Sequence, residues 1–306
     1  MIPVFSALAP VFLMIALGYV LKKRTIVSDA FWSPAEKTTY FLFFPALLLA
    51  NTAKAEFGDI DVLPMILASC FGVLVISALT LGARKHLDLD GPAFTSVFQG
   101  TIRPNVYLGI AAAVSLFGDA GLTLISVPIA VIVPLVNVLG VIILIRYANH
   151  GEDIPGWSKT LGPVARNPLI IACGLGALLN ITGAGLPPLI GPFLEILGRA
   201  ALPIGLLAVG AGLDFHALRQ AGKTVGLTAA TKLMALPAAT YLMCLLFDVS
   251  GLSLTIVVMY SALPVSATSY VLARQMGGDT VLLAGTITAT TVFAMITMPM
   301  VILLLG

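Results

Sequence analysis

The sequence predicts an all-α polytopic membrane protein whose ten transmembrane helices form two inverted repeats of five. Two observations support this prediction. The composition is strongly apolar, and proline and glycine positions of the first half of the sequence recur in the second half. Of the 306 residues, 59% are hydrophobic and only 10% are charged, which is too little polar surface to cover a water-soluble globule of this size. The lipid bilayer is therefore the expected surroundings of the chain.

Ten apolar windows, each near the length of about 20 residues that crosses a hydrocarbon core, follow one another with short connections. The first window resembles a signal peptide in length, but its basic cluster Lys22, Lys23 and Arg24 follows the apolar stretch instead of preceding it. We therefore expect this window to be retained as a helix. The predicted spans are residues 3–21, 34–53, 64–83, 93–116, 121–146, 167–182, 191–213, 224–246, 251–273 and 280–305.

The sixteen lysines and arginines predict the orientation, because short cytoplasmic loops are enriched in them. Eleven lie in the odd-numbered loops, whereas the even-numbered loops hold only Lys54, with Arg199 inside or beside the seventh span. Both termini are thus expected on the outer, periplasmic side of the inner membrane. With short loops and a net charge of only +2, no nucleic-acid partner is expected. The eleven residues are Lys22, Lys23, Arg24, Arg84, Lys85, Arg146, Lys159, Arg166, Arg219, Lys223 and Arg274.

Landmarks of the first half recur in the second at a nearly constant separation, which indicates an internal repeat. They are Pro10 with Pro168, Gly18 with Gly176, Pro45 with Pro203, Ala53 with Ala211, Pro104 with Pro264, Gly118 with Gly278, and Asp119 with Asp279. Because each repeat holds an odd number of spans, the second must enter the membrane from the opposite face. The predicted repeats are residues 1–146 and 167–306, joined by a cytoplasmic linker at 147–166. Asp119 and Asp279 are expected to cap the helices that follow them.

Inverted repeats are typical of secondary transporters, since two halves related in this way can exchange conformations. Because a fold alone does not determine a function, a receptor or a channel of the same architecture remains open. An enzyme is disfavoured because no span carries a Ser/His pair, an aspartyl pair or a zinc motif. The three cysteines, Cys70, Cys173 and Cys244, lie inside apolar spans without metal-ligand spacing, so neither a metal nor a cofactor is expected.

Two predicted spans, 93–116 and 251–273, carry a proline near the centre. A proline there removes a backbone donor and clashes with the preceding turn. The freed backbone groups must pair with protein or line a wet cavity, and such breaks at equivalent positions of two repeats indicate a substrate site. The substrate-binding candidates at the breaks are Arg103, Pro104, Asn105, Tyr107, Pro264, Val265, Ser266, Thr268 and Ser269.

Several of these candidates have a structural alternative. The polar side chains Asn105, Ser266, Thr268 and Ser269 either bind substrate or cap the half-helices. Tyr107 either lines a cavity or packs, as membrane aromatics more often do.

Two basic residues, Arg103 and Lys232, lie deep inside spans, whereas every carboxylate lies in a loop or near a span end. A charge at that depth is costly and is usually functional or paired. A guanidinium beside helix N-termini suits a small anion such as a carboxylate; capping of backbone carbonyls and snorkelling to the interface are the alternatives for Arg103. Lys232 either contacts substrate, compensates charge or has a structural role. The lack of buried acids disfavours a cation/proton antiporter, while a proton-driven anion carrier remains open with no titrating group identified.

Three stretches at the breaks resemble motifs of the auxin efflux carrier family, in particular its bacterial malonate or dicarboxylate transporters. They are Arg103-Pro104-Asn105-Val106-Tyr107-Leu108-Gly109, Leu263-Pro264, and Tyr270-Val271-Leu272-Ala273-Arg274-Gln275-Met276-Gly277-Gly278-Asp279. The resemblance implies a carrier of small organic anions with a fold shared with plant auxin exporters and, more distantly, with bile-acid and sodium/proton carriers. One departure is the second break, Val265-Ser266-Ala267-Thr268-Ser269, which lacks the asparagine frequent there, so only Asn105 of an asparagine pair carries over.

The same resemblance implies how the spans divide. Spans 4 and 9 would cross inside a transport domain made of spans 3–5 and 8–10. Spans 1, 2, 6 and 7 would form a scaffold that often dimerises, so a homodimer is a further expectation. Transport in such folds is pictured as an elevator, in which the transport domain slides against the scaffold.

Overall fold

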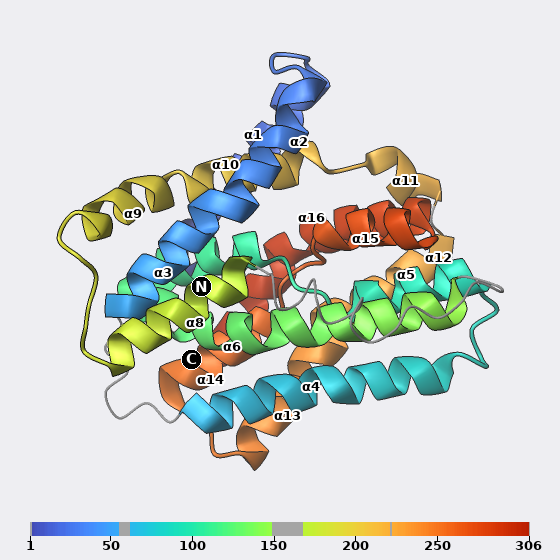
Figure 1. The fold of residues 1–306 in the computed structure, drawn as a ribbon. Helices are drawn as coiled ribbons and strands as arrows, with labels where there is room; N and C mark the ends of the chain where they lie inside the picture. Colours follow the sequence, from blue (N-terminus) through green and yellow to red (C-terminus); the bar gives the residue numbers. More distant parts are fainter. Residues whose placement is uncertain (1, 55–61, 149–167, 221, 306) are drawn as a thin grey trace. The chain divides into compact units, whose positions relative to one another are not determined.

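The computed structural model describes residues 2–54, 62–148, 168–220 and 222–305, and within these ranges it contains helices and no β-strand (Figure 1). Six of the described helices are long and apolar enough to cross a membrane. The prediction of an all-helical polytopic membrane protein is therefore confirmed. The expected linker at 147–166 lies outside the described residues except for its first two positions, as do Lys159 and Arg166. The six stretches are Val4–Lys23, Val62–Ala83, Val106–Tyr147, Ile190–Ala211, Gly222–Leu246 and Thr280–Leu305.

Local features explain why fewer long helices than the ten expected spans are found. Expected spans 93–116 and 251–273 are interrupted by the proline breaks, and expected span 34–53, which contains the π-helix η1 (Thr39–Phe43), is not among the six stretches. Helix α6 (Val106–Tyr147) runs through two expected spans, with Gly118 as its non-helical residue at φ 60° and ψ −142°. Ile171–Ile181 and Gly251–Ser261 are apolar but short. The count of ten and the inverted repeat therefore remain predictions.

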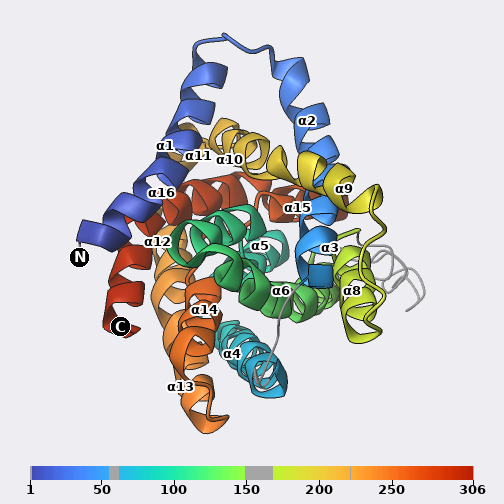
Figure 2. The same cartoon turned by 90° about the vertical axis from the view of Figure 1, so that its left-hand side faces the viewer.

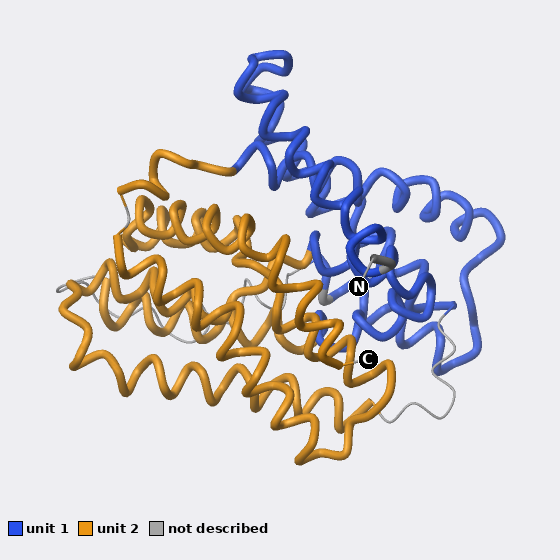
Figure 3. The backbone as a smooth tube through the Cα atoms, turned by 180° about the vertical axis from the view of Figure 1, so that it is seen from behind, with its two compact units in different colours: residues 1–61, 107–130, 165–212 blue, residues 62–106, 131–164, 213–306 orange. Residues whose placement is uncertain are grey.

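The chain divides into two compact units, coloured separately in Figure 3. Unit 1 comprises residues 1–61, 107–130 and 165–212, and unit 2 comprises residues 62–106, 131–164 and 213–306. Helix α6 contributes to both. The helices of unit 1, besides η1 and this part of α6, are α1 (Ile2–Lys23), α2 (Asp29–Thr38), α3 (Phe44–Lys54), α8 (Pro168–Ile181), α9 (Ile190–Arg199) and α10 (Ala201–Ala211).

Unit 1 contains two close helix pairs, α1 with α10 and α3 with α8 (Figures 1 and 2). In each pair, the two helices come closest at a glycine. A Cβ on Gly18 of α1 would lie 2.1 Å from the Leu207 carbonyl oxygen, and a Cβ on Gly176 of α8 would lie 2.7 Å from Thr52 Cβ and 3.2 Å from the Leu49 carbonyl oxygen. Small residues at these points let the backbones come together, as is common between helices in membranes.

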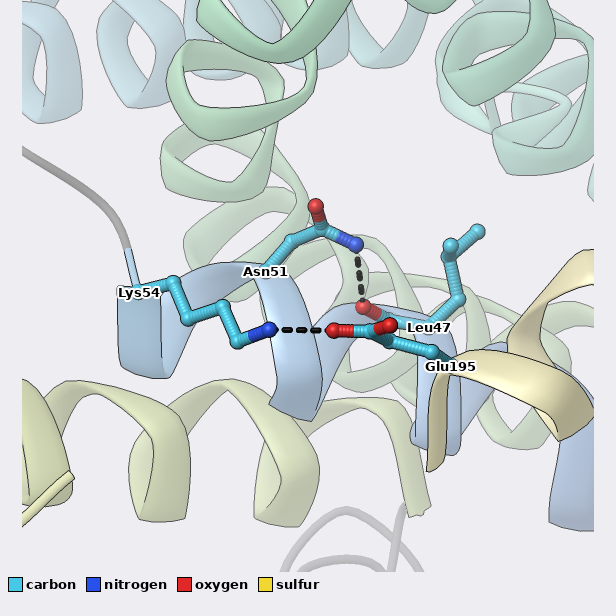
Figure 4. A network of polar contacts seen from close by, with 4 residues as sticks. All are labelled: Leu47, Asn51, Lys54 and Glu195. Carbon is cyan, nitrogen blue, oxygen red and sulfur yellow. Dashed lines mark hydrogen bonds and ion pairs between the residues drawn. The ribbon is translucent and has the colours of Figure 1, made fainter. Parts of the chain in front are cut away.

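Helix α3 is also joined to α9 by a polar contact. Lys54 forms an ion pair with Glu195, and one turn earlier the Asn51 amide donates to the Leu47 carbonyl of its own helix at 2.8 Å (Figure 4). The side chains of this ion pair are 56% and 43% exposed, so it adds little stability.

Unit 2 holds the remaining helices. Its α4 packs along α13, where Gly72 faces Thr240, and α16 packs against α5 and α12. The Asp279 carboxylate accepts from the Leu282 N–H at 2.9 Å, which confirms the expected cap at the start of α16. Besides the second part of α6, the unit contains α4 (Val62–Ala83), α5 (Gly91–Ile102), α11 (Phe215–Gln220), α12 (Gly222–Ala230), the π-helix η2 (Thr231–Ala235), α13 (Leu236–Leu246), α14 (Gly251–Ser261), α15 (Thr268–Met276) and α16 (Thr280–Leu305).

Candidate functional site

Both helix breaks expected at proline are present. Helix α5 ends at Ile102 and α6 begins at Val106, while α14 ends at Ser261 and α15 begins at Thr268. Arg103, the residue before Pro104, is extended at φ −83° and ψ 114°, as steric conflict with the proline ring requires. The sequence therefore determines where each helix stops.

The two breaks pair with each other through the main chain. Pro104 and Val265 form an antiparallel bridge. The Asn105 N–H donates to the Pro264 carbonyl at 2.8 Å, and the Ser266 N–H donates to the Arg103 carbonyl at 3.3 Å. Non-helical backbone at membrane depth must be paired within the protein, and this short ladder brings predicted site residues of both breaks together.

A threonine of α16 supports the second break. Thr290 Oγ1 accepts a hydrogen bond from the Val265 N–H at 3.1 Å, and its own hydroxyl donates to the Thr286 carbonyl at 2.8 Å. Sequence reasoning missed Thr290, because threonines that bond their own helix are common in apolar spans and carry no distinguishing pattern.

Arg103 is buried beside the bridge, with 4% of its surface exposed. Its guanidinium donates from Nη1 to Gln99 Oε1 at 3.1 Å and from Nη2 to Asn137 Oδ1. Snorkelling to the interface is therefore wrong for Arg103, because neutral side-chain amides inside unit 2 hold its head group. These amide oxygens orient the guanidinium.

Gln99 and Asn137 were not among the predicted site residues. Gln99 lies four residues before Arg103, on the same helix face, and each amide stands in an otherwise apolar span. Those two signals could have identified them. The Gln99 Nε2 is buried and has no hydrogen-bond partner among the described residues, so one donor beside Arg103 is unused.

Lys232 lies on the π-helical turn η2 and is fully buried, with 0% exposed. Its Nζ donates to the Ser261 carbonyl, the last residue of α14, at 2.7 Å. A helix C-terminus carries partial negative charge and unpaired carbonyls, so it suits an ammonium.

A small cavity of about 10 Å³, room for roughly one water molecule, adjoins Lys232. Pro104, Ser261 and Thr240 also line it. The Thr240 hydroxyl is buried without a hydrogen-bond partner in the described part of the chain. The cavity thus connects Lys232 to both breaks.

One hydroxyl after the second break, that of Ser266, accepts from the first backbone N–H of α15. Ser266 Oγ lies 2.9 Å from Thr268 Oγ1 and accepts from the Thr268 N–H at 3.3 Å, and the Ser269 hydroxyl donates to the Ser266 carbonyl. The contact of Ser266 with the Thr268 N–H is of the kind expected for a cap, whereas the Thr268 and Ser269 hydroxyls contact only Ser266 among the described residues. Substrate contact by the three remains a prediction.

Tyr107 belongs to unit 1, whereas the other candidates belong to unit 2. The Tyr107 ring stacks on Phe44 with centroids 4.5 Å apart and planes inclined by 1°. This contact favours the packing alternative for Tyr107.

Among the residues that the structure describes, no group of three or more His, Cys, Asp or Glu side chains is placed to hold a metal ion.

Comparison with known proteins matches the chain to one family model over nearly its whole length. The family, described as membrane transport protein, is matched by residues 3–164 and 157–302. An uncharacterized transporter of Methanothermobacter thermautotrophicus is 22% identical over 95% of this chain and 94% of its own. The uncharacterized transporter MJ1031 of Methanocaldococcus jannaschii is 24% identical over 94% of both chains, and the uncharacterized transporter YfdV of Escherichia coli K12 is 21% identical over 88% and 87%.

Proposed function

The chain belongs to the membrane transport protein family, the auxin efflux carrier family that its sequence resembles, and from this premise we propose that it is a secondary carrier of a small organic anion. The proposed substrate is a carboxylate, bound where the breaks of spans 4 and 9 meet. Arg103, Asn105 and Lys232 are the proposed substrate-binding residues, with the backbone at Pro104, Pro264 and Val265 shaping the site.

The main support for the proposed anion site is the buried guanidinium of Arg103. Gln99 and Asn137 hold the guanidinium beside the bridge through neutral oxygens. A guanidinium can meet a carboxylate with two parallel hydrogen bonds. The unused Nε2 of Gln99 is a further donor in the same place. The half-helices that begin at Val106 and Thr268 add partial positive charge.

The glycine contacts of unit 1 support the inverted repeat of ten spans. Gly18 approaches the carbonyl of Leu207, and Gly176, its equivalent at the same separation along the chain, approaches the carbonyl of Leu49. Leu49 and Leu207 are themselves equivalent positions. Two symmetric contacts of this kind are expected when two halves are related by a pseudo-two-fold axis in the membrane plane.

The division into compact units supports an elevator-type mechanism. Unit 1 contains expected spans 1, 2, 6 and 7, and unit 2 contains most of spans 3–5 and 8–10, with residues 107–130 grouped in unit 1 instead. A cavity of about 10 Å³ is too small for a dicarboxylate, so access requires rearrangement. Location in the inner membrane with both termini outside, and a homodimer through unit 1, complete the proposal.

The test is flux of radiolabelled malonate and succinate into proteoliposomes. We expect saturable uptake that Arg103→Ala lowers roughly 10- to 100-fold, the loss expected for a hydrogen bond to a charged group, and that Arg103→Lys lowers less. Arg24→Ala, an exposed arginine at the end of α1, is the control. Unchanged flux in Arg103→Ala would contradict the anion site. Binding without flux would indicate a receptor, and flux that does not saturate would indicate a channel.

A further inference from the structure

Lys232 is buried with few polar partners, and anion binding by Arg103 does not account for this. An ammonium carries three donors, yet Lys232 makes one hydrogen bond in the described part of the chain, to the Ser261 carbonyl. Its neighbours across the cavity are aliphatic, hydroxyl or phenol side chains, and no carboxylate is among the described lining residues. A buried charge without a paired charge is expensive.

Lysine and arginine differ in how they respond to burial without a paired charge. A guanidinium keeps its proton in proteins, whereas a buried lysine can give up its proton and remain as a neutral amine. The amine of Lys232 would still donate one N–H to Ser261, so its 2.7 Å hydrogen bond is compatible with both protonation states. The adjoining cavity has room for about one water molecule, to which the proton can pass.

The same cavity places Lys232 next to the anion site. Ile102 and Pro104, the two chain neighbours of Arg103, line it together with Lys232. An anion at Arg103 therefore favours the ammonium form of Lys232, and departure of the anion favours the amine. The two effects are reciprocal. Protonation of Lys232 raises the affinity of the site for the anion, and anion binding raises the proton affinity of Lys232 by the same factor.

We propose that Lys232 is the proton-binding residue of this carrier, charged when the anion is bound and neutral when the site is empty, so that a proton travels with the anion. The inference rests on the proposed function. In each cycle the ammonium loses one proton to water in the cavity, giving the amine and a hydronium ion, and regains one from the other side of the membrane.

Other ionisable groups surround Lys232, and two are close to the cavity. Tyr260 lines it, and Arg103 adjoins two lining residues. Helices α5 and α16, which also pack against η2, carry no ionisable side chain. The remaining ionisable residues on the elements of unit 2 around Lys232 lie outside the lining: Cys70, Arg146, Tyr147, Lys223, Tyr241 and Cys244. Helix α6 also carries Tyr107 and Asp119, which belong to unit 1.

The test uses malonate and succinate in proteoliposomes with a pH-sensitive dye inside and the membrane potential clamped at zero. For one proton per anion, we expect a gradient of one pH unit to drive about tenfold accumulation by the wild type. The flux that remains in Lys232→Arg, whose charge is fixed, should not respond to the gradient. Lys22→Arg is the matched control, because Lys22 donates to the Ala211 carbonyl at 2.9 Å in unit 1, and it should keep the response.

Calorimetry covers the case in which Lys232→Arg does not fold. Malonate binding to the purified wild type should take up a proton, detected as a heat that changes with the ionisation enthalpy of the buffer. Lys232→Met should bind malonate more weakly, and the heat of the binding that remains should not depend on the buffer. Flux in the wild type that ignores the pH gradient would overturn the coupling and leave the anion carrier standing. Proton uptake retained in Lys232→Met would overturn the role of Lys232. Absence of malonate and succinate flux would overturn both proposals.

Discussion

The backbone N–H of Asn105 donates a 2.8 Å hydrogen bond to the carbonyl oxygen of Pro264. Each residue belongs to a different helix break, and the antiparallel bridge between Pro104 and Val265 continues the contact. Because main-chain atoms form this link, it does not depend on the side chain at position 105. The breaks can stay paired while the side chains around them adapt to a particular substrate.

Substitution of Thr290 by Val tests how much the second break depends on α16. The change keeps the shape but leaves the buried Val265 N–H without its acceptor, which costs about 1–3 kcal/mol. We expect a lower free energy of unfolding and slower malonate flux, measured by thermal unfolding in detergent and by proteoliposome uptake.

Thr291→Val is the control for that change. Thr291 is equally buried on the same helix, but among the described residues its hydroxyl donates to the Ile287 carbonyl of its own helix alone, at 2.7 Å. It should therefore stay close to the wild type in both assays. An equal loss in the two variants would contradict a specific role for Thr290.

Asn137→Leu tests whether the amides position Arg103. Without Asn137, the guanidinium keeps Gln99 as a partner but loses its second described amide contact. We expect the KM for malonate to rise roughly tenfold, the loss of one hydrogen bond to a charged group, while protein yield and melting temperature change little. Asn51→Leu provides the comparison, because in the described part of the chain the Asn51 amide donates to the Leu47 carbonyl of its own helix, a local partner (Figure 4). A similar KM in both variants would argue against positioning.

The fold was predictable where backbone chemistry decides it. Pro104 and Pro264 cannot sit in a continuous helix, so the sequence places both breaks, and the apolar windows place the long helices. The π-helical turns at Thr39–Phe43 and Thr231–Ala235 were not predictable, because they depend on tertiary packing. An apolar window cannot reveal such a turn.

The site was predictable in part. Arg103 and Lys232 stand out as charges inside apolar spans, since such charges are rare. Which groups hold them was not readable, because Asn137 lies 34 positions from Arg103 and Ser261 lies 29 from Lys232. Those pairings depend on how the helices pack. No local pattern in a single sequence shows which residues so far apart along the chain will be in contact. Tyr107 was assigned to the site from its position near Pro104, yet its side chain packs on Phe44.

The orientation can be tested by labelling single cysteines in a variant without native cysteines. We expect Ala184→Cys, an exposed residue between α8 and α9, to react with a membrane-impermeant maleimide in intact cells. Thr25→Cys, exposed in the loop that follows Lys22, Lys23 and Arg24, should react only after the membrane is opened. The reverse pattern would place the termini in the cytoplasm.

The glycine pair Gly18 and Gly176 tests the inverted repeat through stability. Alanine at either position would put its Cβ 2.1 Å from the Leu207 carbonyl oxygen or 2.7 Å from Thr52 Cβ, so the helices must separate, at a cost of about 1–3 kcal/mol. Gly174→Ala on α8 is the control, because an added Cβ there would meet nothing within 4 Å, and its helix should gain up to about 1 kcal/mol. Thermal unfolding should therefore show a lower melting temperature for both paired glycines and not for Gly174. If Gly18→Ala destabilised the protein and Gly176→Ala did not, the two contacts would not be equivalent, and the symmetric packing that supports the repeat would fail.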